Sequence, residues 1–173
     1  IVVDPRPTDY AKSADLWLQI RPGTDDALAL GMLNVIINEE LYDKEFVQEW
    51  CFGFDELRKH VQEYPPAKVS KITWIAENDI VAAARMFSRT RPSSICQRVA
   101  LDHSYNSVQT SRAIFLLAAI CGNLDVKGGN LLPSPMPIKS EVLIAAQQDH
   151  LPRNILEKRI GAQQFPVASG PDG

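Results

Sequence analysis

The feature that most constrains the fold of this chain is a change in the spacing of its apolar residues near residue 24. Before that point, two short apolar runs at 1–3 and 16–20 are each stopped by polar residues and a proline, a pattern typical of buried parallel strands. After it, apolar residues recur along one broad helical face over 24–37, with Thr24 expected as the N-cap. The order strand, short crossover, strand, helix predicts an α/β protein.

The other periodic segments extend this prediction. Thr8 or Asp9 is expected to cap a short crossover helix, and Pro65-Pro66 is expected to break a later one. We expect a fragment of a Rossmann-like, doubly wound parallel sheet with a helical insertion, in which residues 1–130 form the α/β region and residues 131–173 an irregular C-terminal segment. The further elements expected are helices at 43–50, 55–64, 77–89, 107–121, 140–148 and 152–159, and a strand at 93–98.

Composition narrows the possible functions. With 173 residues, 45% of them hydrophobic, the chain can bury roughly 70% of its unfolded surface in one packed domain. Its 18 basic and 21 acidic residues are spread along the chain, which argues against a nucleic-acid partner. The longest apolar stretch, 113–121, is shorter than the ~20 residues that a membrane-spanning helix needs. No signal peptide is recognisable, and the choice between cytoplasm and periplasm stays open.

Three cysteines, Cys51, Cys96 and Cys121, lie far apart in the sequence. Zinc sites and iron–sulfur clusters usually draw two ligands from a close pair such as C-x-x-C. We therefore expect no metal ligand among them and predict that all three are reduced thiols packed as small hydrophobic residues.

Polar residues at the end of the first strand and at the start of the long helix form the first candidate site. Asp4-Pro5-Arg6 follows the strand, and Gly23-Thr24-Asp25 opens the helix. In open α/β sheets, ligands bind beyond the carboxyl ends of the strands, and a helix N-terminus favours an anion. Asp25 is suited to accept paired hydrogen bonds from guanine, and Arg6 to meet phosphate or ribose. The same residues also suit purely structural roles as caps.

Two other segments are weaker candidates. In the segment 99–106, His103 stands beside Asp102 and is suited to act as a base or to position a ligand, although most such histidines are structural. The glycine-rich segment 122–130 lacks the spacing of a dinucleotide fingerprint and the lysine of a P-loop. For that segment we favour a structural interpretation, with Gly122 ending a helix and Gly128-Gly129 making a tight turn.

The order and spacing of these pieces, taken together, closely resemble the bis-pterin enzymes of the dimethyl sulfoxide reductase family. The resemblance covers about residues 1–130. It rests on the segments IVVDPRPT (1–8), ADLWL (14–18), RPGTDDALA (21–29), LYDKEFV (41–47), GF (53–54), AAAR (82–85), QTSRAI (109–114), GNLD (122–125) and GGN (128–130).

This resemblance implies an internal fragment of a catalytic subunit that holds molybdenum or tungsten between two pyranopterin guanine dinucleotides. Both ends of the chain look like cuts through a longer polypeptide. The metal ligand, and the cysteines of an iron–sulfur cluster, are expected upstream, so the fragment alone should be inert. A small-molecule substrate and an electron-transfer subunit are the expected partners of the full-length enzyme. The residues implied to line the nucleotide are Asp4, Pro5, Arg6, Gly23, Thr24 and Asp25.

The segment before the helix 107–121 departs from the resembled family. Many relatives have a glycine-rich loop there, with a glutamine near its end, beside the pterin. This chain has Arg98-Val99-Ala100-Leu101-Asp102-His103 instead, with His103 where glutamine is expected. Val99 and His103 are therefore predicted to contact the cofactor, and the departure points to the non-redox hydratase and hydroxytransferase-like branches.

Two alternatives remain open from the sequence. A stand-alone nucleotide-binding or dehydrogenase domain would use Asp4 and Gly23, but it would need the intact glycine fingerprint. In a non-catalytic interaction module, every cap and turn would be structural.

Overall fold

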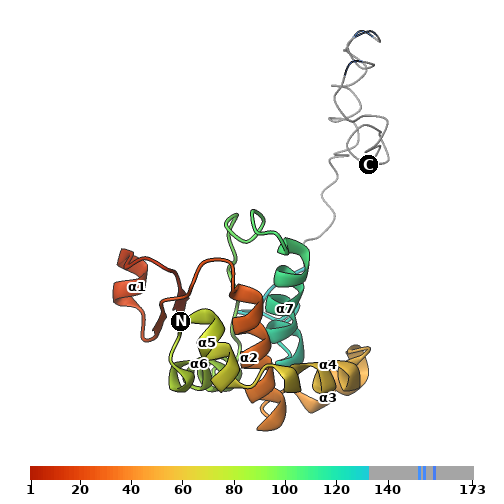
Figure 1. Ribbon diagram of the computed structural model, residues 1–173. Helices are drawn as coiled ribbons and strands as arrows, with labels where there is room; N and C mark the ends of the chain where they lie inside the picture. Colours follow the sequence, from red (N-terminus) through yellow and green to blue (C-terminus); the bar gives the residue numbers. More distant parts are fainter. Residues whose placement is uncertain (133–151, 153, 155–157, 159–173) are drawn as a thin grey trace. The chain divides into compact units, whose positions relative to one another are not determined.

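The fold is seen in a computed structural model that describes residues 1–132 together with Pro152, Asn154 and Lys158 (Figure 1). Residues Ile1–Leu132 form one compact unit. The helix predicted at 140–148 lies outside the described residues, and the one predicted at 152–159 lies almost wholly outside them.

The predicted strand, crossover helix and second strand are confirmed. Strand β1 (Val2–Val3) pairs in parallel with β2 (Trp17–Leu18), with Val2 opposite Trp17 and Val3 opposite Leu18. Helix α1 (Asp9–Ser13) joins them. Its predicted cap is also confirmed, because the Thr8 hydroxyl accepts a hydrogen bond of 3.2 Å from the Ala11 N–H, which satisfies a free donor of the first turn.

The sheet is smaller than the sequence suggested. Within the described residues it has two strands, so this part of the chain is mainly helical and a doubly wound Rossmann-like sheet is not found in it. The strand predicted at 93–98 is wrong. Asn130 explains why: its side-chain amide bonds both the N–H and the C=O of Ile95, each at 2.8 Å. A side chain thus fills the positions that a neighbouring strand would use.

Helix α2 (Asp25–Asn38) is the centre of the fold. It is buried along most of its length and packs against three other helices, as Figure 1 shows. Gly31 allows the close approach of one of them, because a Cβ at this position would lie 2.9 Å from Cγ2 of Val69. The helices that surround α2 are α5 (Pro66–Thr73), α6 (Glu77–Arg89) and α7 (Ser107–Ile120).

The segment between α2 and α5 contains α3 (Lys44–Trp50), α4 (Phe54–His60) and a short 3₁₀ helix, η1 (Val61–Glu63). The helix predicted at 55–64 is therefore split in two. Asn34 of α2 holds the junction, because its side-chain N–H donates to the Val61 carbonyl at 2.8 Å. Pro66 does end the preceding segment, but it also starts α5, which the sequence analysis missed. A proline fits this first helical position because its missing N–H would be unpaired there anyway.

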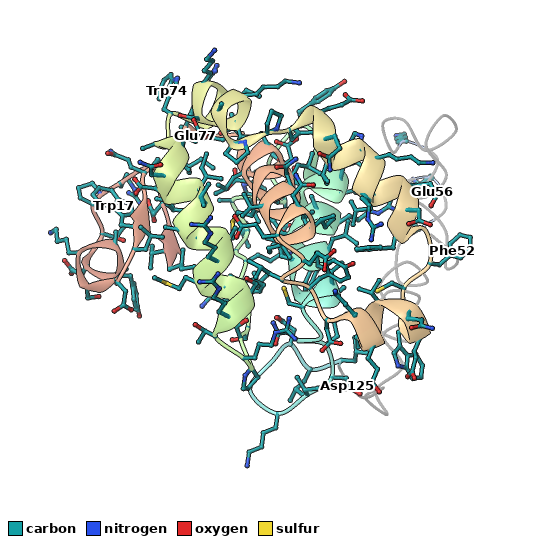
Figure 2. All side chains as sticks on the ribbon, turned by 90° about the horizontal axis from the view of Figure 1, so that it is seen from below. Trp17, Phe52, Glu56, Trp74, Glu77 and Asp125 are labelled. Carbon is teal, nitrogen blue, oxygen red and sulfur yellow. The ribbon has the colours of Figure 1, made fainter. Side chains whose placement is uncertain are left out.

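Helix α5 ends at Trp74, which has a left-handed conformation with a φ of 65°. Figure 2 shows Trp74 near Glu77, at the corner between α5 and α6. The guanidinium of Arg21 lies 5.2 Å from the centre of the Trp74 ring, and the Arg21 N–H donates to the Thr73 carbonyl at 2.8 Å. This corner therefore fixes the loop that leads from β2 into α2.

Candidate functional site

The first part of the site is the turn after β1, which is held rigidly from several sides. The Asp4 carboxylate accepts a hydrogen bond of 2.8 Å from the Arg6 N–H. The indole N–H of Trp17, labelled in Figure 2, donates to the Asp4 carbonyl at 2.8 Å. The side-chain amide of Gln19 donates to the Pro5 carbonyl at 3.1 Å. Residues of β2 and its extension thus fix the shape of the turn through its backbone.

The second part is the loop that enters α2. Gly23 has a φ of +79°, a left-handed conformation that favours glycine. No atom lies within 4 Å of the position that a Cβ would take, so the space beside its Cα is open. Thr24 occupies the N-cap position but does not cap the helix with its side chain. Its hydroxyl donates to the Arg21 carbonyl at 2.7 Å instead. Thr24 therefore occupies the predicted N-cap position, but its side chain does not cap the helix.

Asp25 begins α2 and has an unusual environment for a carboxylate. It is half-buried, and burial raises its pKa above the usual value. A hydrogen bond from its own backbone opposes this rise in pKa, and the negative charge of Asp26 adds to it. A carboxylate that has lost water in this way gains more than an exposed one from a ligand that donates hydrogen bonds to it.

The third part is the segment 93–98, which Asn123 and Asn130 hold in place. Asn123 is 1% exposed. Its side-chain oxygen accepts from the Ser93 N–H at 3.2 Å, and its side-chain N–H donates to the Ser93 hydroxyl at 2.9 Å. Asn130 holds Ile95 as described above. The two asparagines therefore position this segment at two points separated by one residue.

The glycine-rich segment 122–130 gives the two asparagines their geometry. The N–H of Gly122 donates to the Ala119 carbonyl and that of Asn123 to the Ala118 carbonyl, at 3.0 and 2.9 Å, which is a Schellman ending for α7. A Cβ at Gly129 would lie 2.3 Å from the Asn123 carbonyl oxygen. The predicted helix end and tight turn are confirmed.

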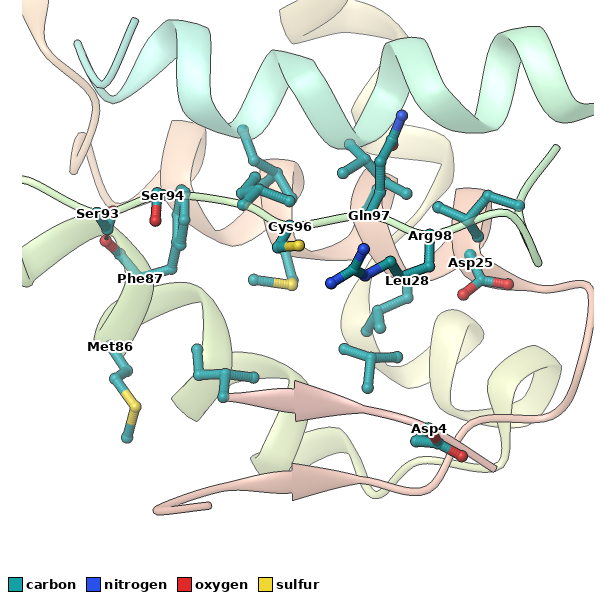
Figure 3. Close-up of a pocket in the computed structure, with 18 of the residues that line it drawn as sticks. Asp4, Asp25, Leu28, Met86, Phe87, Ser93, Ser94, Cys96, Gln97 and Arg98 are labelled. Carbon is teal, nitrogen blue, oxygen red and sulfur yellow. Dashed lines mark hydrogen bonds between the residues drawn. The ribbon is translucent and has the colours of Figure 1, made fainter. Parts of the chain in front are cut away.

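These three parts enclose one cleft of about 640 Å³, a volume within the usual range for a small-ligand site. Figure 3 shows Asp4 and Asp25 on different walls, with the residues of 93–98 crossing between the strands and α7. Apolar residues of α2 and α7 contribute a large share of the remaining lining: Leu28, Ala29, Met32, Ile114 and Leu117.

The cleft brings together some of the residues that the sequence analysis selected. Asp4, Pro5 and Asp25 line it. The other five lie outside its lining: Arg6, Gly23 and Thr24, which adjoin it in sequence, and Val99 and His103, which are exposed in the turns after residue 98.

The cleft lining also includes Cys96, Gln97 and Arg98, none of which was predicted from the sequence. The strand predicted at 93–98 would have placed alternate side chains on opposite faces of a sheet. The available signal was the pair Asn123 and Asn130 in the motif GNLDVKGGN, but nothing in the motif indicates which segment the two side chains bind.

Only part of the cysteine prediction is right. Cys121 is buried, and burial raises its pKa to about 11; Cys51 is half-buried, and burial raises its pKa as well. Cys96 is exposed at the cleft, so for it the packing prediction is wrong. Among the residues that the structure describes, no three histidine, cysteine or acidic side chains are grouped so that they could bind a metal. None of the described helices is long and apolar enough to span a membrane.

Comparison with known proteins gives consistent matches. The family model for molybdopterin oxidoreductase matches residues 1–151. Acetylene hydratase of Syntrophotalea acetylenica is 45% identical over 166 residues, covering 96% of this chain and 23% of that protein. The F420-dependent formate dehydrogenase subunit alpha of Methanocaldococcus jannaschii is 37% identical over 133 residues, covering 77% of this chain and 20% of that protein.

A solved structure, that of acetylene hydratase from Pelobacter acetylenicus, matches the fold with a TM-score of 0.78 and 44% identity. The match covers 94% of this chain and 23% of the solved chain. This chain therefore spans about a quarter of the length of the hydratases that it matches.

Proposed function

This chain belongs to the molybdopterin oxidoreductase family, and we propose that it forms part of the cofactor pocket of a bis-pterin catalytic subunit. The cofactor would be a pyranopterin guanine dinucleotide that carries molybdenum or tungsten. The observation that carries the proposal is the shared cleft, which is lined by Asp4 and Pro5 from the end of β1 and by Asp25 from the start of α2. Alone, the chain would be inactive, because the metal ligand would lie elsewhere in the full-length protein.

The groups in the cleft fit a ligand rich in N–H donors. Asp25 is a half-buried carboxylate that would accept hydrogen bonds from the N1–H and the exocyclic amine of guanine. Gln97, which also lines the cleft, has a buried side-chain oxygen without a hydrogen-bond partner among the described residues. A buried acceptor left unpaired is costly, so a donor from outside the described residues would stabilise it.

The protein's part in the chemistry would be to bind and orient. When bound, the cofactor supplies two-electron or oxygen-atom chemistry at its metal. The turn after β1 is already fixed by Trp17 and Gln19, so Asp4 and Pro5 would meet the nucleotide without rearrangement. This preorganisation lowers the entropy cost of binding.

For the full-length protein we propose a member of the hydratase-like branch, acting on a small-molecule substrate. The 45% identity with acetylene hydratase and the presence of His103 in place of the expected glutamine support this. We also expect an iron–sulfur cluster upstream, a further cofactor-binding domain downstream, and an electron-transfer subunit where the reaction is a net redox change.

The experiment uses the full-length protein and its Asp25→Ala variant. Guanine nucleotide released by acid and bound molybdenum or tungsten are each measured per protein. Loss of a carboxylate with paired hydrogen bonds should weaken cofactor binding by about tenfold to a hundredfold, so both quantities should fall together. Asp55→Ala is the matched control, because Asp55 also stands in the first turn of a helix but is exposed and outside the cleft.

Unchanged guanine content in Asp25→Ala would remove the role assigned to Asp25. A wild-type protein that contains neither guanine nucleotide nor either metal would overturn the proposed function as a whole.

A further inference from the structure

Among its described residues, the cleft contains one cationic side chain, which was not predicted from the sequence as a site residue. Arg98 lines it, and Figure 3 shows its guanidinium extending into the region between Cys96 and Leu28, whereas Gln97 extends toward α7. Arg98 is exposed, and none of the ion pairs among the described residues includes it. Its N–H groups are therefore not held by a carboxylate of that part of the chain.

The other charged residues that line the cleft are all acidic: Asp4, Asp15 and Asp25. An anionic group would be repelled by these carboxylates and would be stabilised only near Arg98. A ligand that fits this distribution carries hydrogen-bond donors at one end, for Asp25, and negative charge elsewhere, for Arg98. A guanine nucleotide has this arrangement, with N–H donors on its base and negative charge on its phosphates.

The backbone around Arg98 is fixed on both sides. Three residues before it, Asn130 binds the N–H and C=O of Ile95, each at 2.8 Å. The carbonyl of Arg98 itself accepts a hydrogen bond of 3.1 Å from the Leu101 N–H. The side chain therefore starts from a defined position, which reduces the entropy lost when it binds a ligand.

We propose that Arg98 binds a phosphate oxygen of the dinucleotide. This inference rests on the proposed function and adds to it the residue that meets the negative charge. A guanidinium is suited to the role because its planar N–H groups can form two parallel hydrogen bonds to one phosphate. Arg6, to which the sequence analysis gave the phosphate or ribose, lies outside the lining of the cleft.

The test uses the full-length protein purified with its cofactor, and three variants of it. Arg98→Gln removes the charge, and Arg98→Lys keeps it without the paired hydrogen bonds. Arg89→Gln removes the charge of a second exposed arginine, which differs from Arg98 in lying outside the cleft lining. The rate of cofactor release is followed after dilution, by filtration and measurement of the guanine nucleotide that stays with the protein. Thermal unfolding of the cofactor-free variants checks that each one folds.

Release should be about tenfold to a hundredfold faster in Arg98→Gln, intermediate in Arg98→Lys and unchanged in Arg89→Gln. Raising the salt concentration should speed release from the wild type more than from Arg98→Gln, because salt screens only the charge that is still present. Release from Arg98→Gln at the wild-type rate, in a protein whose guanine content falls in Asp25→Ala, would overturn the role of Arg98 and leave the proposed function standing. A wild type without guanine nucleotide would refute both.

Discussion

Replacing Asn130 by alanine would test whether one side chain holds the wall of the cleft. The side-chain amide of Asn130 makes two hydrogen bonds of 2.8 Å, both partly buried, to the backbone of Ile95. Each such bond contributes about 1 kcal/mol, and an unpaired buried group costs about 1–3 kcal/mol. Asn130→Ala should therefore lower the free energy of local opening of 93–98 by about 2–4 kcal/mol.

Hydrogen exchange of the full-length protein measures this directly, because the Ile95 N–H donates to Asn130. Exchange at Ile95 should become about 30-fold faster or more, and the guanine content should fall. Asn130→Asp should lie between the wild type and the alanine variant, because a carboxylate can accept from the Ile95 N–H but cannot donate to the Ile95 carbonyl.

Asn38→Ala is the matched control, since Asn38 makes two amide hydrogen bonds to Gln62 at 3.4 and 3.0 Å on the exposed surface. Asn38→Ala should change neither the exchange rate at Ile95 nor the guanine content appreciably. Equal exchange at Ile95 in the wild type and in Asn130→Ala would refute the reasoning, since the segment would then be held by something other than Asn130.

Two further predictions concern titrating groups. The pKa of Cys121 is raised by burial to about 11, so about one thiol in a thousand is ionised at pH 8. Native alkylation followed by peptide mass analysis should label exposed Cys96 well before Cys121, and equal rates would contradict the packing seen for Cys121. The pKa of Asp25 is raised, mainly by burial, so its ionised form destabilises the fold, and the penalty grows as pH rises through that pKa. Asp25→Asn should therefore raise the Tm of the cofactor-free full-length protein at neutral pH, and this gain in Tm should shrink as pH falls. A gain in Tm that does not depend on pH would mean that the charge of Asp25 is not the cause.

The elements that could be predicted from the sequence are those whose causes are local. The cap at Thr8, the start of α3 at Asp43 and the end of α7 at Gly122 each depend on residues within one helical turn. The segment 93–98 could not be predicted in this way. Its path depends on Asn130, which is 35 residues away from Ile95 in the sequence.

The residues of the candidate site differ in the same way: some have a local signal in the sequence and others do not. Asp4, Pro5 and Asp25 could be found because each stands at the end of a strand or the start of a helix, where ligands commonly bind. Arg98 has no such local signal. It belongs to the cleft because two asparagines in another segment bring its backbone there.

The hydrogen bonds of Asn123 and Asn130 hold the backbone of 93–98 independently of the side chains at 96–98. The Asn130 side chain bonds the backbone of Ile95, and the Asn123 side chain bonds the backbone N–H and the hydroxyl of Ser93. Neither asparagine bonds the side chains of residues 96–98. The side chains of Cys96, Gln97 and Arg98 can therefore be replaced without removing either anchor. Substitutions at residues 96–98 should therefore change which groups face the cleft without moving the backbone that carries them.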